Sequence, residues 1–388
     1  MGRALARALA EPLCRQPLCR PLPLQCLRSP TSASHEERTP VCCGCDLPES
    51  NFWNGKGFVK AVVIEPRDDG AVLVLQEVEE PSPSPSEIKV AVRAAGVNRA
   101  DLRRSIVHFS GSERSRRAAI AGLEMAGEVV AVGVDVADIR VGERVMAMTG
   151  SAFAEYACID ARLAVRVPAT MGWTEAAAIP VSFIAAHDAL CNAADARSGE
   201  FIFVSGASSG AGIAAVQIAR YLGARRVLGT AGNPDKLNRL RALGCDVPIN
   251  YRSEQVAAVV HEHTEGRGAH VVIDIVGAAA AQINIDAAAI GARIVCLGRV
   301  GGARATFDLD EFARKRLRMI GVTFRTRSLA ERIEAVTRFR NELLPAIASG
   351  LVKPVIDRVF PLDAAGQAQD YMRGDMHFGK IVLALEAP

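Results

Sequence analysis

A short apolar run that leads into a glycine-rich turn constrains the fold of this chain more than any other feature. Residues 201–204 (FIFV) are apolar without alternation, which is typical of a strand buried on both faces of a parallel sheet. The turn at residues 204–212 (VSGASSGAG) then opens a helical pattern marked by Ile213 and Val216. At such a helix start, backbone amides and the helix dipole can hold a pyrophosphate. A purely structural turn is the alternative, but the strand–turn–helix order favours a dinucleotide site.

Strands and helices alternate along the chain beyond this turn. A strand is predicted at 227–229, a helix at 235–243, and further strands at 271–275 and 293–297. This alternation is the pattern of a doubly wound parallel sheet, in which crossover helices cover both faces. We therefore expect a Rossmann-type α/β domain over residues 181–326.

The residues before Pro180 follow the pattern of a β-rich domain. Residues 87–93 alternate between Ile or Val and other side chains, which predicts a half-buried strand. More short strands are predicted at 127–134, 144–148 and 154–159, between Gly-rich turns. A first domain over residues 57–180, built from non-local strand pairs, follows from this pattern.

The end of the chain returns to strands after one more helix. Ser328 and Glu331 form a capping box, which predicts a helix that ends near Gly350. Residues 355–362 and 380–385 then have strand patterns. We expect this closing part, residues 327–388, to rejoin the first domain, so that the dinucleotide-binding domain is an insertion in it.

Residues 1–56 have a composition unlike the rest of the chain. They are rich in arginine and proline and poor in acids, which disfavours a packed core or a regular helix. We expect a disordered extension, an organelle-targeting leader or a wrongly assigned start, in an otherwise cytoplasmic protein that would be mitochondrial if the leader acts. Cys42, Cys43 and Cys45 form a cluster that lacks a spaced second pair of ligands, so we expect no metal there.

The composition and charge of the chain indicate a soluble, globular protein. With 46 basic and 43 acidic residues, the net charge of +3 gives little electrostatic reason to bind nucleic acid or an anionic membrane. No apolar run is long enough to cross a bilayer. Four cysteines beyond the leader are far apart, and we expect them to be buried as small hydrophobic residues: Cys158, Cys191, Cys245 and Cys296.

Coenzyme preference can be read at the end of the second predicted strand of the Rossmann domain. NAD sites usually carry a carboxylate about 20 residues beyond the glycine turn, where it bonds the ribose 2′-hydroxyl. Residues 229–236 (GTAGNPDK) have no carboxylate at the strand end, and Lys236 and Tyr251 could contact a 2′-phosphate. Because an acid would repel that phosphate, its absence favours NADPH.

Several motifs of this chain, taken together, resemble the zinc-free quinone oxidoreductase (zeta-crystallin-like) family of the medium-chain dehydrogenase/reductase superfamily. The resemblance covers residues from about 60 to 385. It rests on residues 95–102 (AGVNRADL), 122–127 (GLEMAG), 141–145 (VGERV), 176–180 (AAAIP), 249–251 (INY), 274–277 (DIVG) and 379–382 (GKIV). Residues 323–328 (TFRTRS) are similar to the subgroup of tumour-suppressor-inducible quinone oxidoreductases. The resemblance implies a GroES-like catalytic domain, an inserted Rossmann domain, an active site in the cleft between them, and a homodimer.

The resemblance also assigns site residues by position. Asn98 would lie near the nicotinamide as the catalytic residue. The remaining residues would bind the coenzyme: Ser208, Ser209, Gly210 and Ala211 at the pyrophosphate, Gly232, Lys236 and Tyr251 around the 2′-phosphate, Leu297, Gly298 and Arg299 at the nicotinamide ribose, and Lys380 on the phosphate side.

Two substitutions relative to zinc-dependent members of the superfamily bear on the substrate. Those enzymes place Cys and His where this chain has Asn98 and Leu123. Zinc stabilises a localised alkoxide, so a site without it suits acceptors that delocalise the new charge themselves. We therefore expect quinones or conjugated enones as substrates, with no catalytic metal.

The predicted substrate loop differs from that of the family, and the proton donor is not identified. Residues 105–110 replace a Tyr-Pro-Pro-like loop, and Ala185 stands where relatives often have Thr. His108 and His187 are candidate acids, although both could simply be packed or exposed side chains. Two alternative functions remain: a 2-alkenal or enoyl thioester reductase, and a non-catalytic NADPH-binding protein.

Overall fold

The computed structural model describes residues 57–67, 70–102 and 119–385. The described residues belong to one compact unit, Gly55–Pro388. The expectations for residues 1–56, for Cys42, Cys43 and Cys45, and for the loop with His108 lie outside the described residues. In the described ranges, no helix is both long and apolar enough to cross a membrane.

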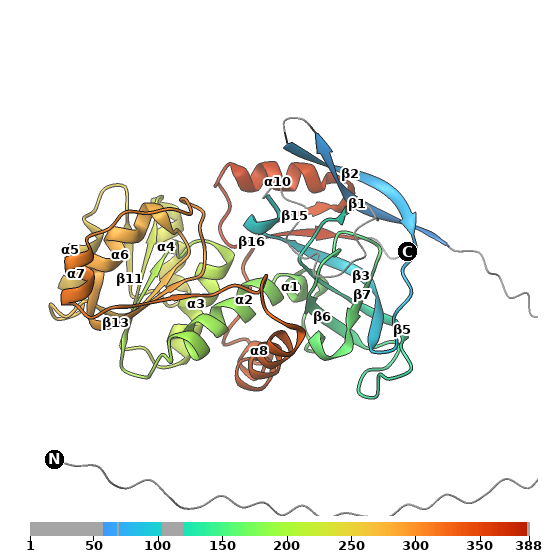
Figure 1. Cartoon of the computed structure of the whole chain (residues 1–388), viewed down its shortest axis with the longest axis horizontal. Helices are drawn as coiled ribbons and strands as arrows, with labels where there is room; N and C mark the ends of the chain where they lie inside the picture. Colours follow the sequence, from blue (N-terminus) through green and yellow to red (C-terminus); the bar gives the residue numbers. More distant parts are fainter. Residues whose placement is uncertain (1–56, 68–69, 103–118, 386–388) are drawn as a thin grey trace, which may run out of the picture. The chain divides into compact units, whose positions relative to one another are not determined.

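A six-stranded parallel sheet forms the predicted Rossmann-type domain (Figure 1). Its strands, in chain order, are β9 (Phe201–Ser205), β10 (Arg226–Ala231), β11 (Val247–Asn250), β12 (Ala269–Asp274), β13 (Ala288–Cys296) and β14 (Arg318–Gly321). Their spatial order is β11-β10-β9-β12-β13-β14, the arrangement in which the first strand lies at the centre and the chain reverses direction beside it. The prediction of a doubly wound sheet is confirmed.

Both faces of this sheet are buried, as the uniform apolar run predicted. In β9, Ile202 and Val204 pack into one core cluster, whereas Phe203 packs into another on the opposite face. The helices that alternate with the strands are α3 (Gly210–Tyr221), α4 (Pro234–Ala242), α5 (Val256–Glu262), α6 (Ala281–Ala287) and α7 (Leu309–Arg314).

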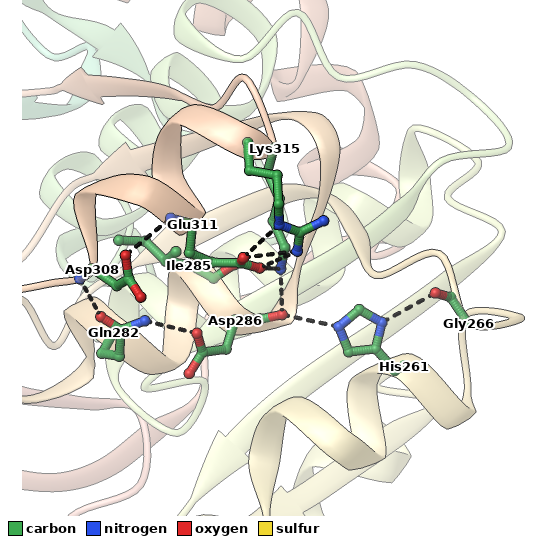
Figure 2. A network of polar contacts seen from close by, with 9 residues as sticks. His261, Gly266, Gln282, Ile285, Asp286, Asp308, Glu311 and Lys315 are labelled. Atoms are coloured by element: carbon green, nitrogen blue, oxygen red, sulfur yellow. Dashed lines mark hydrogen bonds and ion pairs between the residues drawn. The ribbon is translucent and has the colours of Figure 1, made fainter.

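A buried lysine ties three of these helices together at one end of the domain (Figure 2). Lys315 follows α7, and its Nζ donates to the carbonyl oxygens of Ile285 (2.9 Å) and Asp286 (2.8 Å) in the last turn of α6. His261 of α5 lies 2.9 Å from the same Asp286 oxygen through Nε2, and Glu311 pairs with the lysine at 3.2 Å. The carbonyls that end α6 thereby gain partners that the helix itself cannot supply.

The β-rich part contains two sheets, whose strand pairs are antiparallel except that β15 runs parallel to β16. A three-stranded sheet joins β2 (Gly70–Glu79), β1 (Phe58–Arg67) and β4 (Ala119–Ile120). A seven-stranded sheet contains β3 (Glu87–Val97), β5 (Glu124–Val132), β6 (Arg144–Met148), β7 (Tyr156–Asp160), β8 (Val165–Arg166), β15 (Ile356–Pro361) and β16 (Lys380–Ala384). Strand β3 alternates at its start, as predicted, but continues to Val97 with both faces buried.

The last strand of the chain pairs with an early one. Strand β16 runs antiparallel to β3, with Ile381 opposite Val97 and Leu383 opposite Ala95. This pairing confirms that the closing strands rejoin the first domain and that the parallel sheet is inserted between them. The exact domain bounds, 57–180, 181–326 and 327–388, stay predictions.

The remaining α-helices of the described residues are α1 (Trp173–Ala177), α2 (Pro180–His187), α8 (Leu329–Glu342), α9 (Leu344–Ala348) and α10 (Ala365–Arg373). The capping box forms, since Ser328 Oγ accepts from the amide of Glu331. The helix expected to reach Gly350, however, breaks into α8 and α9. Pro345 has no amide proton and its ring crowds the preceding turn, which explains the break.

Candidate active site

A cavity of about 1000 Å³ lies at the carboxyl ends of the parallel strands, against residues of the first domain. All of the site residues predicted from the sequence line it, and their roles as ligands stay predictions. They are Asn98, Ser208, Ser209, Gly210, Ala211, Gly232, Lys236, Tyr251, Leu297, Gly298, Arg299 and Lys380. The carboxyl edge of a doubly wound sheet is where such folds bind ligands.

The glycine-rich turn is shaped by its own hydrogen bonds. Ser209 is the N-cap of α3, and its Oγ accepts from the Gly212 amide (3.1 Å) and donates to the Gly206 carbonyl (2.9 Å). Gly206 has a φ of +82°, a conformation that side chains other than glycine rarely adopt. A Cβ at Gly212 would lie 2.4 Å from the Gly206 oxygen, so the turn can close this tightly only with glycine. The start of α3 thus lines the cavity, and its predicted role in binding a pyrophosphate stays a prediction.

The basic residues Lys236 and Arg99 lie in one corner of the cavity, near the ends of β10 and β11. We call this part of the cavity the cationic corner. Gly232 packs so closely on Tyr251 that a Cβ there would lie 2.7 Å from the phenol oxygen. Lys236, in the first turn of α4, donates from Nζ to the Asp375 carbonyl (2.7 Å), and burial lowers its pKa. Of the three residues predicted around the 2′-phosphate, Gly232 and Tyr251 pack against each other, and Lys236 lines the same cavity.

His377 is a lining residue that the sequence reasoning missed. Its side chain is 8% exposed, and no described residue offers a hydrogen-bond partner to its Nδ1. Burial, and then the positive charges of Arg99 and Lys236, lower its pKa to about 4. His377 is therefore neutral at neutral pH. No motif marks it, because its burial and the charge of Arg99 that acts on it depend on residues far apart in the chain.

Asn98 lies in a buried polar cluster at the other end of the cavity. Its Oδ1 accepts from Lys380 Nζ at 2.7 Å, and its Nδ2 donates to Glu124 Oε1 at 2.9 Å. Lys380 Nζ also lies 2.5 Å from Glu124 Oε1, and the Val181 amide donates to the other carboxylate oxygen at 2.7 Å. The carboxamide of Asn98 is therefore held at both ends. The Lys380 ammonium is engaged here, while its stem runs beside Gly210 of the pyrophosphate turn.

A second carboxyl group lies next to Asn98. Asp101 Oδ2 accepts from the Asn98 backbone amide at 2.7 Å. Burial raises the pKa of Asp101 to about 7, against the lowering effect of that amide and of Lys380. This group would change its charge near neutral pH.

Asp274, at the end of β12, holds two loops: its carboxylate holds the loop after β12, and its backbone carbonyl holds the loop after β13. Asp274 Oδ1 accepts from the amides of Val276 and Gly277, each at 2.9 Å. The Asp274 carbonyl accepts from the amides of Leu297 (2.8 Å) and Gly298 (3.0 Å). Residues 297–299 are thereby placed on the cavity wall, where the ribose was predicted.

The candidate acid His187 does not line this cavity. It is 1% exposed, its Nε2 lies 2.9 Å from Glu342 Oε2, and its ring packs edge-on against Phe339.

Of the four cysteines expected to be buried, Cys245 is buried, whereas Cys158, Cys191 and Cys296 are only partly so.

Two family models match this chain in succession. An alcohol dehydrogenase GroES-like domain matches residues 84–169, and a zinc-binding dehydrogenase domain matches residues 210–341. The first covers β3 to β8, and the second begins at α3 and ends in α8.

The relatives include both large synthases and proteins of this size. Erythronolide synthase EryA2 of Saccharopolyspora erythraea is 32% identical over 86% of this chain, but this chain spans only 9% of that protein. Quinone oxidoreductase of Lama guanicoe is 28% identical over 86% of this chain and 99% of its own length.

Solved structures share the whole two-domain arrangement. The Escherichia coli quinone oxidoreductase complexed with NADPH has a TM-score of 0.73 and 26% identity, covering 84% of this chain and 99% of that one. CurF ER cyclopropanase from the curacin A pathway has the same TM-score, identity and coverage. With its GroES-like and inserted Rossmann domains, the chain belongs to the medium-chain dehydrogenase/reductase superfamily and, within it, to the quinone oxidoreductase-like family.

Proposed function

We propose that this chain is an NADPH-dependent oxidoreductase that transfers hydride to quinones or similar conjugated carbonyl compounds, with no zinc ion at the reacting centre. The main support for the proposal is that one cavity is lined by the start of α3, by the cationic corner and by the cluster around Asn98. The similarity to quinone oxidoreductases, one of them complexed with NADPH, supports it. A homodimer and a cytoplasmic or mitochondrial location stay expectations.

The residues of the cavity fit a phosphorylated dinucleotide. The amides at the start of α3 would hold the pyrophosphate, and a Cβ at Gly210 would fill the space beside the Lys380 stem, 2.6 Å from its Cδ. Lys236 and Arg99 lie at the other corner, where Asp375 pairs with Arg99, and the remaining positive charge favours a 2′-phosphate over a hydroxyl. When bound, NADPH would supply a hydride ion to the acceptor.

The acceptor end of the cavity is built for positioning. Asn98 lines this end of the cavity, and its carboxamide is held in place by Lys380 and Glu124. Leu123, 9% exposed, lies on the same wall where zinc-dependent relatives place a histidine. The described residues of this wall would orient a flat conjugated molecule and offer no strong acid, which suits acceptors that spread the new negative charge over their own π system.

One alternative reaction has specific support. A 2-alkenal or enoyl thioester reductase would share the fold and coenzyme, and EryA2 and CurF are similar to this chain. Side-by-side kinetics with a small quinone and with a conjugated enone or enoyl thioester separate the two. A higher kcat/KM for the quinone supports the proposal, and a higher value for the enoyl substrate refutes the quinone assignment. NADPH binding without turnover of any acceptor would indicate a binding protein.

Coenzyme choice is tested at Lys236. Replacing it by alanine removes a charged partner of the phosphate, worth about 1.5–3 kcal/mol, so the KM for NADPH should rise roughly 10- to 100-fold while that for NADH stays unchanged. Lys353→Ala, an exposed lysine outside the cavity, is the matched control. An equal effect of Lys236→Ala on both coenzymes contradicts the assignment.

Zinc independence is tested with a chelator. Protein dialysed against a strong chelator should reduce quinones at the rate of untreated protein. Activity that is lost on chelation and restored by zinc, while the unfolding temperature stays unchanged, would overturn the metal-free mechanism.

A further inference from the structure

A histidine, a cysteine and a carboxylate meet outside the coenzyme cavity. His187 ends α2, Cys191 lies in the π-helical segment that follows (Asp188–Ala193), and Glu342 is the last residue of α8, which runs beside α2 (Figure 1). One ligand atom from each lies within 4.8 Å of the other two. No other group of three His, Cys, Asp or Glu side chains in the described ranges meets this spacing.

The local structure fixes two of these side chains. His187 and Cys191 are four residues apart, so successive turns present them on one side of the segment. Phe339 packs edge-on against the imidazole, with ring centroids 6.1 Å apart. Arg338 donates from Nε to Glu342 Oε1 at 3.1 Å, which leaves Oε2 directed at the histidine. Short π-helical segments are frequent at functional sites.

The histidine has bonding capacity that the described residues do not use. Its side chain is 1% exposed, and its Nδ1 is buried without a hydrogen-bond partner among them. An unsatisfied buried polar atom costs about 1–3 kcal/mol. Burial lowers the pKa of His187 and raises that of Cys191 to about 12, so the pair is a neutral imidazole and a thiol, unlike an activated nucleophile.

We propose that His187, Cys191 and Glu342 form a zinc site that joins α2 to the end of α8, separate from the reacting centre. Nitrogen, sulfur and carboxylate oxygen together suit Zn²⁺, whereas Mg²⁺ and Ca²⁺ select oxygen alone. On binding, a zinc–sulfur bond forms as the Cys191 S–H bond breaks, and the proton leaves to solvent past the exposed Glu342. One thiolate and one carboxylate then balance the charge of the ion.

The site is distinct from the one at which hydride is transferred. None of the three residues lines the coenzyme cavity, although Val181, Ser182 and Ala185 of the same helix do. The ion would therefore act on stability, by tying the helix that walls the cavity to α8. Quinone reduction could be metal-independent, as proposed above, whether or not this site exists.

Cobalt(II) is the probe of choice, because a cobalt–thiolate bond gives a charge-transfer absorption that imidazole and carboxylate ligands do not. The full-length protein is used with Cys42, Cys43 and Cys45 replaced by serine, so that the N-terminal cluster cannot contribute. We expect one cobalt ion per chain with the thiolate band, displacement of that band by zinc, and a higher unfolding temperature with zinc.

Three variants in this background decide the assignment. Cys191→Ala should abolish the band and the thermal shift, and Glu342→Gln should weaken binding roughly tenfold or more. Cys245→Ala removes another buried thiol, whose pKa is also about 12, and should change nothing. A background protein that binds no cobalt through a thiolate, or a band that survives Cys191→Ala, overturns the proposal.

Discussion

The buried ammonium of Lys380 can be removed without changing the size of the side chain much, by replacing it with methionine. In the structure this ammonium donates to Glu124 Oε1 (2.5 Å), Asn98 Oδ1 (2.7 Å) and the Val97 carbonyl (3.2 Å). The Lys380 side chain is 4% exposed and that of Glu124 0%, so water cannot replace the lost contacts. Removing one partner of a buried ion pair costs about 3–5 kcal/mol.

We expect Lys380→Met to lower the free energy of unfolding by about this amount, 3–5 kcal/mol, since Glu124 would keep only the neutral donors of Asn98 and Val181. Urea unfolding followed by circular dichroism measures it. Glu124→Gln should also destabilise, and the double variant Glu124→Gln/Lys380→Met should lose less than the sum of the two. Arg197→Met, which breaks a fully exposed ion pair with Asp195, should leave stability almost unchanged.

Activity adds an independent readout to the same variant. If Lys380 mainly holds Asn98, then kcat should fall while the KM for NADPH changes little. If its ammonium instead binds a phosphate, as the sequence suggested, then KM should rise and stability should hardly change. An unfolding midpoint equal to that of the parent protein would refute the reasoning about the buried pair.

Two further predictions concern the cationic corner. Gly232→Ala places a methyl group 2.7 Å from the Tyr251 phenol oxygen, so the ring must move, and the Kd for NADPH measured by fluorescence titration should rise; an unchanged Kd would mean that this wall does not contact the coenzyme. Folding lowers the pKa of His377 from 6.5 to about 4, so the unfolded chain binds a proton that the folded chain excludes as the pH falls through this window. Stability should therefore drop by about 2 kcal/mol between pH 7.5 and 5, and His377→Gln should remove that part of the pH dependence in urea titrations, whereas equal slopes for both proteins would contradict it.

The parts of the fold that depend on local pattern could be predicted from the sequence. The uniform run at residues 201–204 identified a strand buried on two faces, because a side chain on either face of β9 meets a covering layer. The glycines of residues 206–212 identified the turn, because Gly206 has a positive φ and a Cβ at Gly212 would clash with the Gly206 oxygen. The prediction of one helix from Ser328 to near Gly350 was wrong, because it did not take into account Pro345, which separates α8 from α9.

The polar architecture of the site could not be predicted, because it depends on contacts between distant segments. Glu124 and Lys380 are 256 residues apart in the chain, and nothing in either neighbourhood marks them as partners. The sequence therefore placed Lys380 on the phosphate side from its position alone. For His377, the lowered pKa arises from burial and from Arg99, which sequence spacing does not encode.

The inserted topology explains why two consecutive residues reach both ends of the site. The chain leaves the first domain, builds the parallel sheet and returns through β16, which pairs with β3. At the start of β16, the Gly379 amide donates to the Ser208 carbonyl in the pyrophosphate turn (3.1 Å), and Lys380 reaches Asn98 in the first domain. Gly379 has a φ of +95°, and a Cβ there would lie 2.3 Å from the Val355 carbonyl oxygen, so this crossing requires glycine. The returning strand thus couples the position of the coenzyme turn to that of Asn98, and a change at Gly379 should disturb both together.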